Sequence, residues 1–181
     1  MVLRVYKYGE KILREKSRPV AVVDDALRRL ADDMIETMHA AKGVGLAAEQ
    51  VGHDERMCVI DIPSGCEDEE DELFNAPIAM PLKLWNPEIV AREGSCHDKE
   101  GCLSFPGIGG SVERAAQVTC QYLDINNLPQ IVTARGFLAR ALQHEIDHLD
   151  GILYVDRMAE DERHSFEPKL KKLSDSNGGV E

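Results

Sequence analysis

The chain has 181 residues, a length typical of one domain, and its 43% hydrophobic and 30% charged residues match an average globular protein, not a collagen-like or disordered one. Its 33 acidic residues outnumber its 21 basic residues and give a formal net charge of −12. This charge repels polyanions and argues against a protein that binds nucleic acid over its whole surface, so we expect no specific DNA binding.

The N-terminal region and the cysteines indicate the compartment. Residues 1–20 alternate charged and apolar side chains without an uninterrupted apolar stretch, so the sequence predicts neither a signal peptide nor a membrane span. Five cysteines are scattered along the chain, and no two of them form a CxxC pair. We therefore expect a cytoplasmic protein with reduced thiols and no zinc ribbon.

An amphipathic helix is predicted to start near Asp24 or Asp25, either of which can cap its N-terminus. Apolar residues follow with helical spacing at Leu27, Leu30, Ala31, Met34, Ile35 and Met38. The helix is expected to end toward Gly43. The Gly-Val-Gly sequence at 43–45 can adopt backbone conformations closed to residues with side chains, but it lacks the GxxxxGK[ST] pattern of a phosphate-binding loop.

The middle of the chain favours β-structure. Residues 56–62 (RMCVIDI) predict a buried strand, whereas the acidic run EDEEDE at 67–72 predicts a mobile surface loop over about 64–80. Segments with β-branched or aromatic residues, separated by Gly, Pro and Asn, predict antiparallel strands and hairpins at 85–91, 111–113, 117–124 and 130–134.

A second helix is predicted from about residue 135 to residue 149, with Gly151 just past its end. One broad face of this helix carries Leu138, Ala141, Leu142, Glu145 and Leu149. Glu145 is the one charged residue on that face. Beyond the helix, residues 159–173 are mostly charged and weakly periodic, and 174–181 are expected to be a disordered tail.

Within this helix, His144, Glu145 and His148 form the sequence HEIDH. Residues four apart on a helix share one face, so both imidazoles can bind one metal ion. The spacing also places Glu145 beside the open position of that ion, where a carboxylate takes a proton from water instead of binding the metal. The pattern therefore predicts a hydrolytic metal centre.

The spacing does not identify the third protein ligand that such a metal usually takes. The extended pattern HExxHxxGxxH is excluded because Tyr154 stands where its third histidine would fall. A carboxylate from Glu160, Glu162 or Glu167 and a thiolate from any of the five cysteines both stay open.

Three separated stretches stand out: GVGLAAEQ at 43–50, EGCLS at 100–104 and QHEIDHLDG at 143–151. Together and in this order they resemble the peptide deformylase family. The resemblance extends from KYGEKILREKSRPV at 7–20 to GILYVDRM at 151–158 and leaves out the acidic insertion and about the last twenty residues. It implies an α+β fold in which antiparallel β-sheets surround a central HExxH metal-binding helix. Residues 1–173 would then form a single catalytic domain.

The resemblance implies that Cys102 is the third ligand, as a thiolate, beside His144 and His148, with water in the fourth position. It further implies one Fe²⁺ per chain. A Cys/His/His set suits zinc on geometry alone, so the preference for iron comes from the family and not from the ligands. Zn²⁺, Ni²⁺ or Co²⁺ are expected as substitutes.

The resemblance also implies a reaction, the removal of the formyl group from the N-terminal formyl-methionine of newly synthesised proteins, with release of formate. Glu145 would take a proton from water and return it to the departing amine. The backbone N–H of Leu103 and the side-chain amide of Gln50 would donate to the oxygen that becomes negatively charged.

N-formylmethionyl nascent peptides are the partners that the resemblance implies. The backbone at Val44, Gly45 and Gly101 would pair with the peptide as an added strand. Phe137 and Ala141 would contact the methionine side chain, with ordinary core packing as the alternative for both.

Two further features stay open. Glu100 and Arg140 form either an ion pair near the metal or two solvent-facing charges. Gly109 and Gly110 stand where many family members carry an arginine at the mouth of the groove, so contacts beyond the first residues of the peptide are not predicted.

Two rival functions are kept. The first is a zincin-type metallo-endopeptidase that uses His144, His148 and a downstream glutamate. The second is a non-catalytic, metal-stabilised peptide-binding module. For the basic cluster at Lys169, Lys171 and Lys172 we favour a solvated helix end, with a transient ribosome contact as the alternative.

Overall fold

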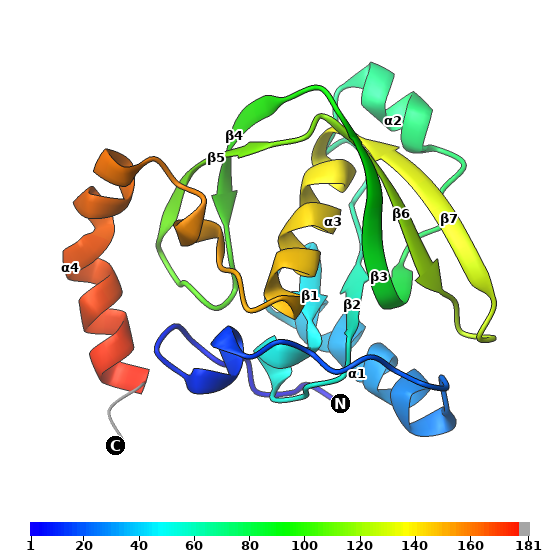
Figure 1. Ribbon diagram of the computed structural model, residues 1–181, viewed down its shortest axis with the longest axis horizontal. Coiled ribbons are helices and arrows are strands. Elements are labelled where there is room, and N and C mark those ends of the chain that lie inside the picture. The colour runs from blue at the N-terminus through cyan, green and yellow to red at the C-terminus, as the bar shows by residue number, and fades with distance from the viewer. Residues whose placement is uncertain (178–181) are drawn as a thin grey trace.

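The computed structural model describes residues 1–177, in which two antiparallel sheets surround one central helix (Figure 1). The larger sheet has the order β1-β2-β3-β6-β7, formed by β1 (Gly45–Ala47), β2 (Met57–Ile60), β3 (Leu82–Glu93), β6 (Gln117–Leu123) and β7 (Pro129–Arg135). The smaller sheet pairs β4 (Cys96–Gly101) with β5 (Gly109–Arg114). The predicted antiparallel hairpins and the α+β class are confirmed.

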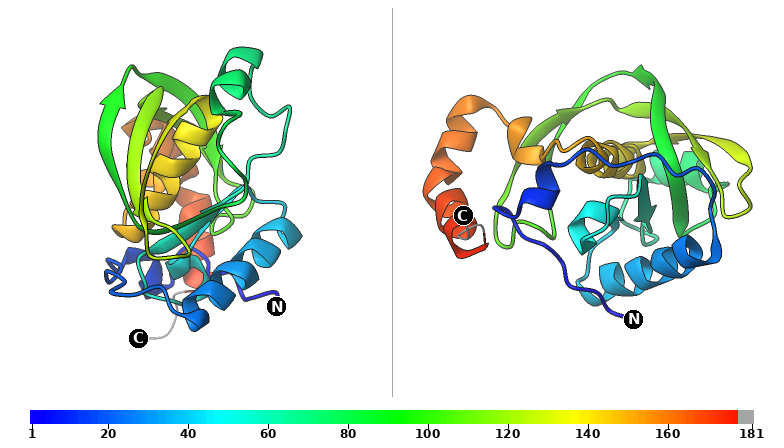
Figure 2. Two further views of the ribbon diagram at one scale, coloured as in Figure 1. Left: turned by 90° about the vertical axis from the view of Figure 1, so that its right-hand side faces the viewer. Right: turned by 60° about the horizontal axis from the view of Figure 1, so that its bottom comes forward.

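The central helix is α3 (Gly136–Leu149), which the right-hand view of Figure 2 shows nearly end-on between the sheets. From Leu138 to Leu149, every residue of α3 except Arg140 is buried. Most of these residues are apolar and pack against the larger sheet. The polar residues of the HEIDH sequence are thereby held away from bulk water. In this buried position each of them needs a hydrogen-bond partner or a ligand.

Strand β2 separates two apolar cores, because successive side chains point to opposite faces of a sheet. Cys58 packs in the core with α3, whereas Met57 packs in the core with α1 (Asp25–Ala40). Helix α1 begins as predicted, since the Asp24 carboxylate accepts a hydrogen bond from the Leu27 N–H at 2.9 Å. The larger sheet is thus covered by one helix on each face.

The acidic run contains a helix, which corrects the loop expected over about 64–80. Helix α2 (Glu69–Asn75) begins after Asp68, whose carboxylate accepts a hydrogen bond from a backbone N–H of the first turn. That turn is entirely acidic, and a helix N-terminus stabilises negative charge. Glu67 accepts a hydrogen bond from the Leu138 N–H at 2.9 Å, so this segment caps the N-terminus of α3.

The weakly periodic C-terminal region forms α4 (Glu160–Asn177), which has a single buried residue, Leu170. Leu170 belongs to a third apolar cluster, beside β5 and the loop that contains Phe105. Helix α4 continues to Asn177, which corrects the disordered tail expected from residue 174; the rest of that tail, 178–181, lies outside the described residues. In the described part of the chain, no helix combines the length and apolar character needed to cross a membrane.

Three 3₁₀ helices complete the fold: η1 (Lys11–Arg14), η2 (Ala48–Val51) and η3 (Tyr154–Asp156).

Candidate metal centre and its pocket

His144 and His148 of α3 lie beside Cys102, which directly follows β4. The ligating atoms of these three residues all lie within 4.8 Å of one another. The Cys102 Sγ lies 3.2 Å from the His148 Nε2, and both histidines are buried. One thiolate and two imidazoles form a donor set that suits a borderline divalent ion. The structure therefore brings Cys102 to the two histidines, as the resemblance implied.

Two of the three downstream glutamates that the sequence left open make other contacts from α4. Glu162 accepts a hydrogen bond from the Ser111 N–H at 2.9 Å, and Glu167 lies 3.0 Å from the ring of His164. Within residues 1–177, neither glutamate belongs to a group of three metal-binding side chains.

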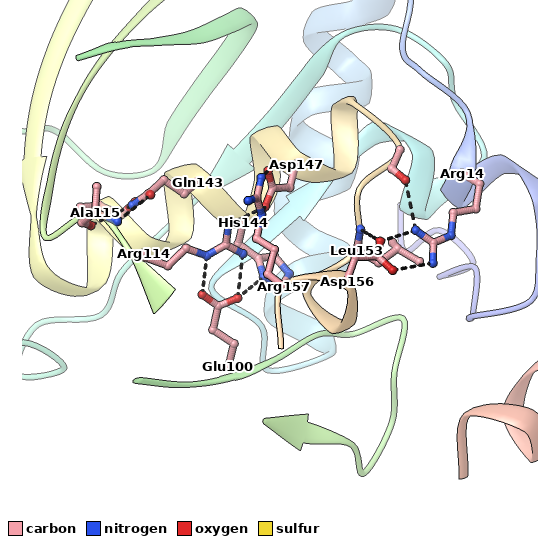
Figure 3. Close-up of polar contacts among 12 residues, drawn as sticks. Arg14, Glu100, Arg114, Ala115, Gln143, His144, Asp147, Leu153, Asp156 and Arg157 are labelled. Atoms are coloured by element: carbon pink, nitrogen blue, oxygen red, sulfur yellow. Dashed lines mark hydrogen bonds and ion pairs between the residues drawn. The ribbon is translucent and has the colours of Figure 1, made fainter. Parts of the chain in front are cut away.

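A buried network of charges orients His144 (Figure 3). The His144 Nδ1 lies 2.9 Å from the Glu100 Oε2, so the other ring nitrogen is left for a metal. Arg114 donates to both oxygens of Glu100, at 2.8 and 3.0 Å, and also pairs with Asp147. Arg157 also donates hydrogen bonds to Asp147, with its Nη2 2.6 Å from the Oδ1.

The structure bears out neither alternative that the sequence left open for Glu100 and Arg140: Arg140 pairs with Asp98, and Glu100 is buried against Arg114. Burial alone would raise the pKa of Glu100, but hydrogen bonds from His144 and Arg114 outweigh burial and hold that pKa at about 2. Glu100 is therefore a permanent anion beside His144.

Glu145 faces the centre with an unpartnered oxygen. Its side chain is buried, and its Oε2 has no hydrogen-bond partner within the described residues. Burial raises its pKa to about 7, although the charge on His144 opposes this shift. A buried polar atom without a partner is costly, so an oxygen in this position marks a place for water or a ligand.

Gln50 of η2 is held in a fixed orientation beside Cys102. Its Oε1 accepts a hydrogen bond from the Ala47 N–H at 2.9 Å, so its Nε2 must point the other way. The Nε2 lies 3.3 Å from the Cys102 Sγ and 3.1 Å from the Ser104 Oγ. Leu103 lies between Cys102 and Ser104 in the sequence, and its carbonyl oxygen accepts a hydrogen bond from the Lys7 Nζ at 2.7 Å.

These groups face a pocket of about 630 Å³. All five residues that the sequence assigned to peptide binding line it: Val44, Gly45, Gly101, Phe137 and Ala141. Phe105 and Ile108 add apolar surface from the loop between β4 and β5. The pocket therefore offers exposed backbone and an apolar wall next to Cys102 and His144.

The sequence did not single out several residues of the site. Arg114 lies outside the three motif stretches, and only its burial, at 5% exposure, marks it. Ser104 is the last residue of the EGCLS stretch, so its motif was visible although its contact with Gln50 was not. Lys7, Lys42 and Lys99 line the pocket and were not expected there.

Comparisons with known proteins cover nearly the whole chain and identify one family. The pattern of the family described as "Polypeptide deformylase" matches residues 2–164. The peptide deformylase of Endomicrobium trichonymphae is 44% identical over 170 residues, covering 94% of each chain. That of Alkalilimnicola ehrlichii is 46% identical over 172 residues, covering 95% of this chain and 90% of the relative.

Solved structures show the same similarity. The crystal structure of peptide deformylase from Thermus thermophilus matches with a TM-score of 0.84 and 37% identity, covering 97% of this chain and 99% of the other. The structure from Ehrlichia chaffeensis in complex with actinonin matches with a TM-score of 0.83 and 40% identity, covering 94% and 96%.

Proposed function

This chain belongs to the peptide deformylase family, and we propose that it removes the formyl group from the N-terminal formyl-methionine of newly synthesised proteins, releasing formate. The observation that carries the proposal is the buried Glu145 carboxylate. This residue has an unpartnered oxygen and lines a pocket together with Cys102 and His144, two members of the Cys/His/His set. That combination is suited to hydrolysis of an amide.

Cys102, His144 and His148 would hold one divalent ion per chain. A bound divalent ion supplies Lewis acidity, which makes a nearby water more acidic and polarises a carbonyl oxygen. We take the ion to be Fe²⁺, with Zn²⁺, Ni²⁺ or Co²⁺ as substitutes. Glu100 supports this set because its anionic oxygen fixes the ring of His144.

Glu145 is assigned the proton transfers. Its Oε2 accepts a proton from water while the water oxygen bonds to the formyl carbon. The bond between that carbon and the methionine nitrogen then breaks, and Glu145 returns the proton to the nitrogen. Water and the formyl amide are thereby converted to formate and a free amino group.

Gln50 and Leu103 are assigned the formyl oxygen, which gains negative charge as water attacks. The Gln50 Nε2 and the backbone N–H of Leu103 would donate to it, and one such donor can lower a barrier by about 3 kcal/mol. The contact between Ala47 and Gln50 supports this role, because it fixes the amide before substrate binds. A donor that is already in place costs no reorganisation during the reaction.

The peptide is expected to bind as an added strand along the backbone of Val44, Gly45 and Gly101. A Cβ built on Gly101 would meet no atom within 4 Å, so this stretch leaves room for another chain. The methionine side chain would lie against Phe137 and Ala141. We further expect a cytoplasmic location. For Lys169, Lys171 and Lys172 a solvated helix end stays the prediction, with transient contact with the ribosome as its alternative.

The test is formate release from a formyl-Met tripeptide, with protein prepared anaerobically with Fe²⁺ or reconstituted with Ni²⁺. Glu145→Gln keeps the side-chain volume and removes the base, so release must disappear in that variant. Cys102→Ser should lose the metal. A zincin-type endopeptidase would instead keep metal and activity in Cys102→Ser, and a non-catalytic module would release no formate in any form.

A further inference from the structure

Two lysines at the mouth of the pocket have no anionic partner among the described residues. Lys42 lies between α1 and β1, and Lys99 lies in β4 directly before Glu100. Both line the pocket and both are exposed. Within residues 1–177, neither ammonium group lies within ion-pair distance of a carboxylate. We call Lys42 and Lys99 together the lysine rim.

Apart from the buried Glu145, the other charged side chains that line the pocket have partners. Arg140 lies 2.5 Å from the Asp98 carboxylate, and the Lys7 Nζ donates to the carbonyl of Leu103. Glu100 is held by Arg114 and His144. The lysine rim therefore gives the mouth a positive local charge, although the chain as a whole carries −12.

The backbone of Lys42 supports a role for its side chain. Its φ angle is +57°, a left-handed conformation, and the following Gly43 N–H donates to the Met38 carbonyl at the end of α1. Glycine is the usual residue in the left-handed position after a helix, because other residues are strained there. A lysine in this strained backbone position therefore indicates a role for its side chain.

We infer that the lysine rim selects substrates, favouring formyl-methionyl peptides that carry an acidic side chain at the second or third residue. The inference rests on the proposed function, which places the formyl group beside Glu145 and the methionine against Phe137. An extended peptide advances about 3.3 Å per residue, so the residues that follow methionine lie at the mouth. A carboxylate there meets two ammonium groups that have no other partner in the described part of the chain.

The experiment compares kcat/KM for three C-terminally amidated peptides: formyl-Met-Ala-Glu, formyl-Met-Ala-Gln and formyl-Met-Ala-Lys. A second set places Glu, Gln or Lys directly after methionine. With the metal-reconstituted enzyme at low salt, we expect a preference for Glu over Lys of about three- to tenfold, because exposed ion pairs are weak. The preference should shrink at high salt, which screens exposed charges.

The double variant Lys42→Glu with Lys99→Glu should reverse the order and favour the Lys peptides. The double variant Lys11→Glu with Lys171→Glu is the matched control, since both lysines are exposed and neither lines the pocket. It makes the same change of charge elsewhere on the surface and should leave the preference unchanged.

Equal kcat/KM for the Glu and Lys peptides would overturn the inference that the lysine rim selects substrates and would leave the deformylase activity intact. Absence of turnover with every peptide would overturn the proposed function instead. In that case the binding of dye-labelled Met-Ala-Glu and Met-Ala-Lys amides, followed by fluorescence anisotropy, still decides the inference. Tighter binding of the Glu peptide that is lost in the double variant supports it, and equal binding overturns it.

Discussion

Gly45 lies directly against the carboxyl group of Glu145: a Cβ built on Gly45 would approach the Glu145 Cδ to 2.8 Å and would overlap the Oε1. The main chain of β1 thus fixes the position of the proposed base. This contact requires a residue without a side chain, whatever the backbone conformation.

Gly45→Ala is expected to displace Glu145 and to lower kcat by about a hundredfold, since small misplacements of reacting groups have effects of that size. The metal content, measured by elemental analysis, should not change. Gly65→Ala is the control, because Gly65 is exposed, lies outside the pocket, and a methyl group added there meets no atom within 4 Å. An equal loss of kcat in both variants would contradict this account.

Arg114→Met is expected to destabilise the fold by about 3–5 kcal/mol, because it leaves the buried carboxylates of Glu100 and Asp147 without their shared partner. Urea unfolding followed by circular dichroism measures the loss. Arg157→Met is the control, since Arg157 is more exposed and contacts only Asp147 in this network. A loss no larger for Arg114→Met than for Arg157→Met would show that the network contributes little.

Glu49→Gln should stabilise the protein at alkaline pH. Glu49 is 0% exposed, neither of its carboxylate oxygens has a hydrogen-bond partner within residues 1–177, and burial raises its pKa to about 8. The folded state therefore holds a proton that the unfolded state releases near pH 4.5, and stability falls as pH rises from about 4.5 through 8.

The loss in the parent protein should be on the order of 2–4 kcal/mol between pH 5 and pH 9. Thermal unfolding at both pH values measures it, and the Tm gap between the variant and the parent should widen at pH 9. A gap that stays constant with pH would mean that Glu49 does not titrate in this range.

Removal of the metal should lower the Tm, because an ion that binds only the folded state stabilises it by mass action. Scanning calorimetry of the Ni²⁺-reconstituted protein, before and after chelation, measures the shift. Cys102→Ser should show a smaller shift, and Cys66→Ser, at an exposed cysteine, should match the parent. An unchanged Tm after complete removal of the ion would argue against the Cys/His/His set as its ligands.

Local patterns predicted much of the fold and part of the site. The helical spacing around Met34 and the HEIDH sequence identified α1 and two of the three residues that could hold a metal, because those patterns repeat along one helix face. Cys102 could not be selected from spacing, since β4 brings it to α3 from a distant part of the chain. Its assignment needed the resemblance to a family.

Three features escaped local patterns for physical reasons. Strand β4 (CHDKEG) is polar and mostly exposed, so it lacks the alternation that marks a half-buried strand. Helix α2 was mistaken for a loop because like charges repel in general but are stabilised in a first helical turn. Arg114 is buried by tertiary contacts alone, and nothing adjacent in the sequence indicates its partners.

The pocket is built where β1, the end of β4 and α3 meet, and these segments are widely separated along the chain. Bringing these segments together closes long loops, which costs conformational entropy. That cost is offset only when all three segments pack against one another. A partly folded chain can contain α1 and local hairpins without any peptide groove. We therefore expect the pocket to form late in refolding, together with the rest of the tertiary structure.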